Sequence, residues 1–273
     1  MKGGGMTGRH PLIGVMIIVM IVGSALPAAA ITFGVQDGEG HPYVGLVVFE
    51  GQSPVGPIWP CSGVLLSPTV FLTAGHCTYG ANEARVWFDS DLSNNPDYPN
   101  GGPSSIEADQ IHTHPSFDGY TTFPNTSDIG LVILEVPVSL DEYGELPALA
   151  MLDNLTPSRG RKDIIRTVGY GYQMVKPFFQ WEPVRFTSTS KLVNLRSHLT
   201  DGYNIHTSNN PGKGQGTGGS CFGDSGGPIF YPEDGNTVVG IVSFGLNDNC
   251  KGAGFAYRTD IEEALDFIES FLE

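Results

Sequence analysis

The sequence predicts an all-β protein built from two compact halves. Glycine and proline are frequent, with 37 and 20 of 273 residues, and they follow no collagen-like period, which indicates many tight turns. Short β-forming runs recur between turn signals, and no segment between them has a helical period, which excludes the alternating pattern of a parallel α/β sheet. Because the chain exceeds the usual size of one domain, we expect two halves.

Seven runs of β-forming residues are the predicted strands. Each is short and lies between turn signals, a spacing typical of barrels or sandwiches. The runs cover residues 43–49, 62–66, 70–73, 84–88, 130–134, 166–168 and 237–244. The predicted crossover is the segment 141–162, which contains Pro147 and Pro157, so the halves are placed at 31–145 and 146–273.

The predicted helix lies at the end of the chain, over residues 260–272. Thr259 and Glu262 have the spacing of a capping box, which marks a helix start. The apolar residues that follow share one face: Ile261, Leu265, Ile268 and Leu272. We expect this face to dock against a barrel.

The charge balance bears on possible partners. The chain has 29 Asp and Glu against 14 Lys and Arg, a formal charge of -15. Nucleic-acid binding needs clustered cations to neutralise phosphates, so no nucleic-acid partner is expected. We expect a monomer.

Residues 1–30 are predicted to be a secretory signal peptide. Lys2 and Arg9 precede an apolar run at 12–22, and the segment ends in the small residues Ala28 to Ala30. The uncharged run 11–33 is long enough to be a membrane anchor, but Pro27 and the Ala-x-Ala pattern favour cleavage. The mature chain is then expected to start at Ile31, to be secreted and extracellular, and to keep no stable membrane association.

The four cysteines are expected to form disulfides in this oxidising setting. Cys61, Cys77, Cys221 and Cys250 allow three pairings, which spacing does not separate. Zinc is the rival interpretation, and the absence of a Cys-x-x-Cys pair disfavours it. The acidic loop 89–103 lacks the ordered ligand spacing of a calcium site. We therefore expect no metal and no cofactor.

Two segments offer an imidazole and a carboxylate at strand ends. His76 follows the apolar strand 70–73 and precedes Cys77, whose disulfide would fix the ring as a general base requires. Asp128 stands at the start of the apolar run 130–134. Taken alone, this aspartate is more typical of a turn, because Asp commonly bonds nearby backbone where a chain enters a strand.

The segment 221–228, Cys-Phe-Gly-Asp-Ser-Gly-Gly-Pro, is more specific. A nucleophilic serine needs an exposed hydroxyl, small neighbours and backbone N–H groups aimed at the developing oxyanion. Ser225 has Gly226 and Gly227 after it, and Gly223 allows its peptide plane to turn its N–H inward. The pattern therefore predicts a nucleophile.

Taken together, the segments 73–77, 127–131, 221–228 and 241–245 resemble those of the chymotrypsin-like (trypsin-like) secreted serine proteases. The order His, Asp, Ser is that of this family and differs from subtilisins and α/β-hydrolases. The resemblance implies two antiparallel β-barrels with a C-terminal α-helix, with His76 and Asp128 on the first and Ser225 on the second. It also implies the disulfides Cys61–Cys77 and Cys221–Cys250.

The activity implied by the resemblance is that of a serine endopeptidase acting on polypeptides. Ser225 would attack the peptide carbonyl, His76 would take its proton, and Asp128 would orient the imidazole. The N–H groups of Gly223 and Ser225 would form the oxyanion hole. Two alternatives remain at this point: an inactive protease-like binding module, and an esterase using the same triad.

Substrate-binding residues are also implied by the resemblance. Gly219 and Ser220 would floor the pocket for the residue before the scissile bond, and the pocket walls would include Gly245 and Gly254. The segment from Ser243 through Phe244 to Gly245 would pair with extended substrate. Because no carboxylate stands at the floor, we expect a weak preference for large apolar residues, unless Asp248 turns inward and attracts a cation.

The segment 31–34, Ile-Thr-Phe-Gly, resembles a loosened version of the mature amino terminus of these enzymes. In the family this terminus pairs with the aspartate before the nucleophile, which here is Asp224. A buried carboxylate needs such a partner. We therefore expect signal cleavage after Ala30 to free the Ile31 ammonium to pair with Asp224.

Overall fold

The first half of the chain folds into a closed antiparallel β-barrel. The computed structural model describes residues 1 and 30–272 except 55, 156–162, 174–178 and 213–215, so the predicted signal peptide lies outside the described residues apart from its two ends. Around the barrel the strands run β2 (Val44–Ser53), β3 (Gly56–Leu65), β4 (Val70–Thr73), β7 (Gly130–Leu134), β6 (Ile106–Thr113) and β5 (Ala81–Trp87). Every pairing between neighbours is antiparallel.

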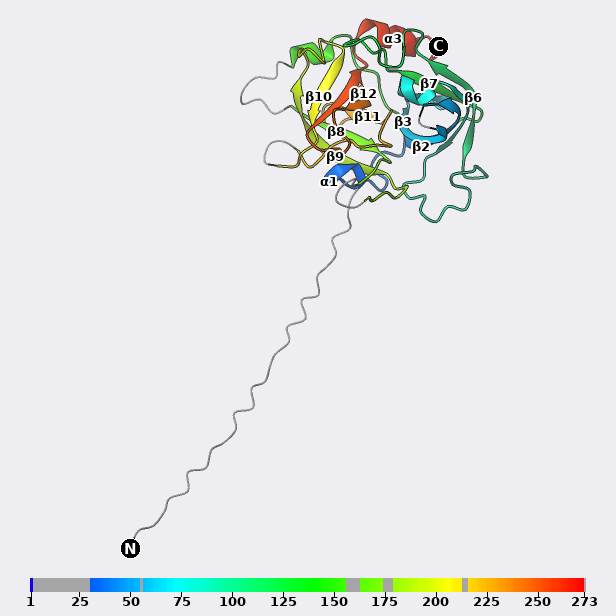
Figure 1. Cartoon of the computed structure of the whole chain (residues 1–273). Coiled ribbons are helices and arrows are strands. Elements are labelled where there is room, and N and C mark those ends of the chain that lie inside the picture. The colour runs from blue at the N-terminus through cyan, green and yellow to red at the C-terminus, as the bar shows by residue number, and fades with distance from the viewer. Residues whose placement is uncertain (2–29, 55, 156–162, 174–178, 213–215, 273) are drawn as a thin grey trace.

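The second half forms another ring of antiparallel strands beside the first (Figure 1). Its order is β9 (Phe186–Asn194), β10 (Asn204–Ser208), β13 (Ala253–Arg258), β12 (Val238–Gly245), β11 (Pro228–Phe230) and β8 (Ile164–Gly169). The ring closes because β8 also pairs with β9. The short strand β1 (Val35–Gln36) pairs with β9, so part of the predicted first half joins the second sheet.

The all-β, double-barrel fold predicted from the sequence is confirmed. Strands β4 and β7 have the predicted bounds, because both are buried apolar runs. Strands β6, β9, β10, β11 and β13 were not among the predicted runs. The sequence of β6 is mostly polar and only partly buried, and β9 carries Thr, Ser and Lys, so neither has the apolar run that marks a strand.

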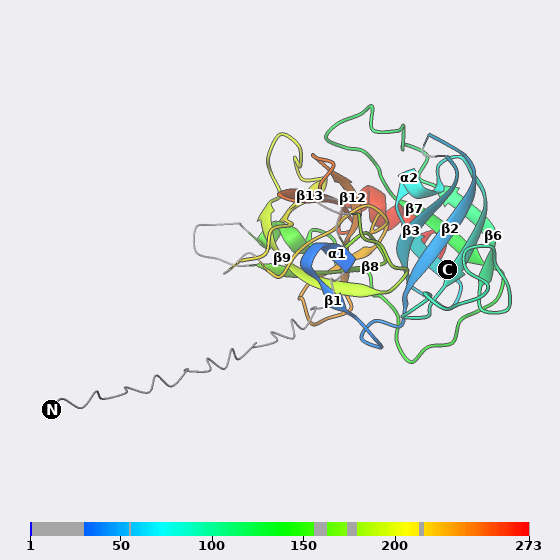
Figure 2. The ribbon, with the colours of Figure 1, turned by 60° about the horizontal axis from the view of Figure 1, so that its bottom comes forward.

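Among the described residues, three helices and one 3-10 turn accompany the strands, and the turn, η1 (Met151–Asn154), lies in the predicted crossover. Helix α1 (Ala30–Phe33) lies against β9, and Figure 2 shows it beside β8 and β9. Helix α2 (Gly75–Thr78) is a single turn that carries His76. Among the described residues, no helix has the length and apolar character needed to cross a membrane.

The terminal helix α3 (Glu262–Glu269) is shorter than predicted and starts differently. Its N-cap is Ile261, with no side-chain cap, so the predicted capping box is wrong. The hydroxyl of Thr259 instead donates to the carbonyl of Val238 in β12. The apolar face of α3 packs on the large core cluster, which contains residues of both barrels, and Phe267 contacts the ring of His114 beside β6. Thus α3 links both halves.

A buried arginine ties the two barrels together on the β2 side. Arg185, at the start of β9, is 1% exposed and lies 3.0 Å from the carboxylate of Asp37. Its guanidinium also donates to the carbonyls of Val44, Phe88 and Gly38. Burial raises the pKa of Asp37, but its bond to His41 and the charges of His41 and Arg185 outweigh burial and lower it.

We predict that Arg185→Met lowers the free energy of unfolding by about 3–5 kcal/mol, because it leaves Asp37 buried without the guanidinium. Urea unfolding measures the change. Arg196→Met is the matched control, since Arg196 is 75% exposed and should alter stability little. Equal stabilities for the two variants would contradict the role given to Arg185.

Candidate active site

His76 is held at the rim of the first barrel by its neighbours. Strand β4 ends at Thr73, and the one-turn helix α2 presents the ring, whose side chain is 24% exposed. Next to it, Cys77 forms a disulfide with Cys61 of β3. The indole N–H of Trp59 donates to the carbonyl of Cys77 at 2.9 Å. The helical turn therefore cannot rotate freely.

Asp128 is fully buried just before β7 and accepts hydrogen bonds from several donors. The backbone N–H of His76 donates to Oδ1 at 2.8 Å, and Nδ1 of the same residue lies 3.0 Å from Oδ2. The hydroxyls of Tyr120 and Ser243 both donate to Oδ2. Burial raises the pKa of Asp128, but the His76 charge and these hydrogen bonds outweigh burial and lower it.

Ser225 lies in the loop before β11, which is pinned against the first barrel. The carbonyl of Ser225 accepts the N–H of Ser62 at 2.8 Å, and the hydroxyl of Ser62 donates to the carbonyl of Gly223 at 2.9 Å. Gly226 has φ +79°, and a Cβ there would lie 2.0 Å from Oγ1 of Thr73. Only glycine fits that position.

Two backbone N–H groups, one on each side of Asp224, have no acceptor in the described part of the protein. They belong to Gly223, whose φ is +89°, and to Ser225. The neighbouring N–H groups of Asp224, Gly226 and Gly227 are all bonded to carbonyls. Unpaired N–H groups at an exposed loop can bind a developing oxyanion.

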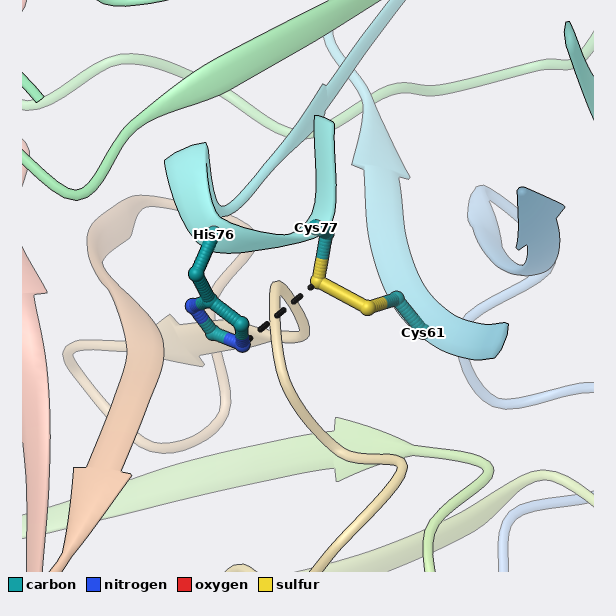
Figure 3. A group of neighbouring side chains, drawn as sticks. All are labelled: Cys61, His76 and Cys77. Atoms are coloured by element: carbon teal, nitrogen blue, oxygen red, sulfur yellow. Dashed lines mark hydrogen bonds between the residues drawn. A yellow bond between two sulfur atoms is a disulfide. The ribbon is translucent and has the colours of Figure 1, made fainter. Parts of the chain in front are cut away.

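One cavity of about 360 Å³ is lined by both His76 and Ser225. Within the described residues no hydrogen bond joins the Ser225 hydroxyl to the ring. Nε2 of His76 instead lies 3.7 Å from Sγ of Cys77 (Figure 3). The cluster Cys61, His76 and Cys77 is compact enough to suggest a metal site, but its sulfurs form a disulfide and offer no thiolate.

The same cavity contains part of the predicted substrate-binding set. Ser220, Ser243, Phe244 and Gly245 line it. Gly219 and Gly254 are not among its lining residues, and neither is Asp248. The lining residues also include Tyr120, Asn209, Phe222, Val242, Asn247 and Ala253. Apart from the His76 ring, the lining side chains are uncharged.

Asn209 is a lining residue that the sequence analysis did not identify. It is 3% exposed, and its amide donates to the carbonyl of Ser220 at 2.9 Å. A Cβ on Gly219 would lie 2.1 Å from its Oδ1, and one on Gly254 would lie 2.6 Å away. These glycines therefore make room for a neutral amide. No motif marks Asn209, which stands before an Asn-Pro pair that indicates only a turn.

Asp224 is fully buried beside the nucleophile loop. The N–H groups of Gly171 and Cys221 each donate to its carboxylate at 2.8 Å. Burial raises its pKa to about 7, although these two bonds act to lower it. Ile31 is fully buried against Val184 and Phe186, and no hydrogen bond or ion pair joins it to Asp224 in the described chain, where it is still linked to residue 30.

The fold is that of the double-barrel serine hydrolases, and comparisons with known proteins identify the family. Residues 34–268 match the Trypsin family model. The chain is 27% identical to brachyurin of Leptuca pugilator over 77% of this chain and 86% of that protein. It is 25% identical to serine protease 1 of Drosophila melanogaster over 87% of this chain and 84% of that one.

A solved structure supports the fold. HL collagenase, 18% identical, superposes with a TM-score of 0.66 over 89% of this chain and 97% of that chain. The chain belongs to the trypsin family and is a serine-type endopeptidase. The resemblance identified from the four sequence segments is thereby confirmed, and the family's substrates are polypeptides.

The raised pKa of Asp224 predicts a pH effect on the stability of the chain in which Ile31 is linked to residue 30. The folded state favours the protonated carboxyl, so the associated stability is present below the unfolded pKa near 3.8 and is lost as pH rises to about 7. Asp224→Asn should flatten this fall, which urea unfolding measures between these pH values. Asp266→Asn, at an exposed position of α3, should keep the wild-type dependence. An unchanged fall in Asp224→Asn would contradict the prediction.

Proposed function

We propose that this endopeptidase is secreted and cleaves peptide bonds through His76, Asp128 and Ser225, with an acyl-enzyme intermediate. The supporting observation is that His76, which is paired with Asp128 of the same barrel, lines the cavity that Ser225 of the second barrel also lines. The unpaired N–H groups of Gly223 and Ser225 stand on the loop of Ser225 itself. The proposed base and nucleophile therefore share one cavity, and the proposed oxyanion donors lie on the nucleophile's loop.

In this mechanism Nδ1 of His76 keeps its proton, because Asp128 accepts a hydrogen bond from the Nδ1–H group, and Nε2 is left to act as a base. Ser225 Oγ attacks the substrate carbonyl while Nε2 takes the hydroxyl proton. The negative oxygen then binds the N–H groups of Gly223 and Ser225. His76 returns the proton to the leaving amine, and water repeats the steps to release the acyl group.

Chemistry requires Nε2 to face Ser225, whereas the described ring has Nε2 nearest Cys77 Sγ. A hydrogen bond of this kind is often loose without substrate and tightens in the complex. The contacts of Asp128 hold Nδ1, so the ring can adjust about this pivot. Binding of substrate in the cavity is proposed to complete the alignment.

For the residue before the scissile bond, we propose a preference for large apolar side chains. The cavity offers Phe244, Phe222 and Val242 together with the neutral amide of Asn209. It offers no carboxylate that would pair with Arg or Lys of a substrate. An uncharged pocket of this kind favours burial of apolar surface.

A panel of peptides that differ only before the scissile bond tests this preference. We predict that kcat/KM is at least about tenfold higher for Phe or Leu than for Arg, since a cation would be desolvated without a partner. Peptides with Lys serve as a second cationic arm. Fastest cleavage after Arg would contradict the proposal and would implicate Asp248.

Activation is proposed to follow cleavage after Ala30. A free Ile31 ammonium would supply the cation that the buried Asp224 carboxylate lacks among the described residues. Thr32 already bridges to Gly219, which places this segment beside the loop that leads to Asp224. Amino-terminal sequencing of the active secreted protein tests the proposal, and an active form that starts elsewhere would refute it.

We predict that Asp128→Asn lowers kcat by about 10⁴, the loss known for this triad in other enzymes of the family, because the amide favours the wrong tautomer of His76. Melting temperature should change little. Asp109→Asn, at an exposed site on β6, is the matched control. Ser225→Ala should abolish covalent labelling by an organophosphonate. Normal turnover in Asp128→Asn or continued labelling of Ser225→Ala would refute the assignment.

A further inference from the structure

Tyr120 is placed inside the hydrogen-bond network of His76 and Asp128 although no sequence motif includes it. Its hydroxyl lies 2.8 Å from Nδ1 of His76 and donates to Oδ2 of Asp128 at 2.7 Å. It also lies 3.2 Å from the carbonyl of Ser243 in β12. The hydroxyl of Tyr120 therefore contacts His76, Asp128 and strand β12, which is expected to bind substrate.

The proton positions follow from these contacts. Burial and the Asp128 charge raise the pKa of Tyr120 well above its usual value, so the hydroxyl stays protonated. Because the hydroxyl donates its hydrogen bond to Asp128, its lone pair faces the N–H at Nδ1 of His76. The arrangement is a chain from His76 N–H to Tyr120 O–H to the carboxylate, beside the direct contact at 3.0 Å.

The loop that carries Tyr120 is shaped to turn it inward. Tyr120 has φ +68°, a conformation that costs a non-glycine residue about 1–3 kcal/mol, and Gly119 before it has φ +76°. The carboxylate of Asp118 fixes the turn by accepting the N–H of Thr121 at 2.9 Å. The ring is then packed between Phe123 and Phe244. Strain held at such a position is commonly tied to function.

We infer that Tyr120 is a positioning residue of this enzyme: its hydroxyl fixes the Nδ1–H tautomer of His76 and stabilises the imidazolium formed during catalysis. The inference rests on the proposed roles of His76 and Ser225. As His76 gains a proton, the Tyr120 oxygen faces the positive ring with the negative end of its dipole. Asp128 supplies the full charge, and Tyr120 supplements it.

Among the described residues, few other ionisable groups lie near the His76 ring. The cavity-lining side chains contributed by β12 and by the nucleophile loop are uncharged. Asp224 directs its carboxylate to backbone N–H groups, and Asp118 binds the threonines of its own loop. Tyr120 and Asp128 are therefore the ionisable groups that contact His76 in the described structure.

The test is Tyr120→Phe, which keeps the ring packing and removes only the hydroxyl. We expect kcat to fall about 3–10-fold, the cost of one hydrogen bond, with KM changed less than about twofold. The acidic limb of the pH profile of kcat/KM should shift to lower pH by about half a pH unit, because the imidazolium loses a hydrogen-bond acceptor. Purely structural packing would leave that limb in place.

Tyr79→Phe is the matched control. Its ring contacts Phe117, as the ring of Tyr120 does, and its hydroxyl makes no hydrogen bond among the described residues. It should keep wild-type kinetics at every pH. If Tyr120→Phe has an unchanged limb, or one moved to higher pH, the inference is overturned.

A parallel His76→Ala variant separates this failure from failure of the proposed function. Loss of activity in His76→Ala together with a wild-type profile in Tyr120→Phe would overturn only the role of Tyr120. Full activity in His76→Ala would overturn the proposed mechanism and the inference with it. Thermal melting of each variant verifies that the fold is kept.

Discussion

The contact between Ser62 and the nucleophile loop is the constraint on which the rest of the site depends. Ser62 lies in β3 of the first barrel, and its N–H and hydroxyl donate to the carbonyls of Ser225 and Gly223. Its oxygen also accepts the N–H of Tyr170 from the second barrel. Because His76 belongs to the first barrel and Ser225 to the second, this junction sets the distance between the proposed base and the proposed nucleophile.

Local sequence was enough to predict the residues to which the direct chemical roles are assigned in the proposed mechanism. His76, Asp128 and Ser225 stand in short segments whose neighbours have a physical reason: a cysteine that pins α2, an apolar strand after the aspartate, and glycines around the serine. Gly226 illustrates why such segments can be identified from sequence: a Cβ there would lie 2.0 Å from Thr73 of the other barrel, so the position requires glycine. The buried apolar strands could also be predicted, because burial on both faces leaves a continuous apolar run.

What the sequence did not reveal depends on contacts between distant segments. Tyr120 and Asn209 lie in loops and have no local sequence signal, and only the folded structure places β12 and the nucleophile loop beside them. Strand β6 has only partly buried residues, so it lacks an apolar run. The capping box failed because the hydroxyl of Thr259 is used by β12, a partner that no local rule includes.

Three fully buried aspartates differ in the groups that compensate the free-energy cost of burying a carboxylate. Asp260 has a guanidinium, since Arg258 Nε lies 2.7 Å from it, and Asp128 has the His76 ring with two hydroxyls. Asp224 has two backbone N–H groups and, among the described residues, no cation. A carboxylate left in that state disfavours its own ionised form. A cation placed beside Asp224 would therefore stabilise its ionised form, which is the physical basis of the proposed coupling between an amino terminus and the loop that carries Ser225.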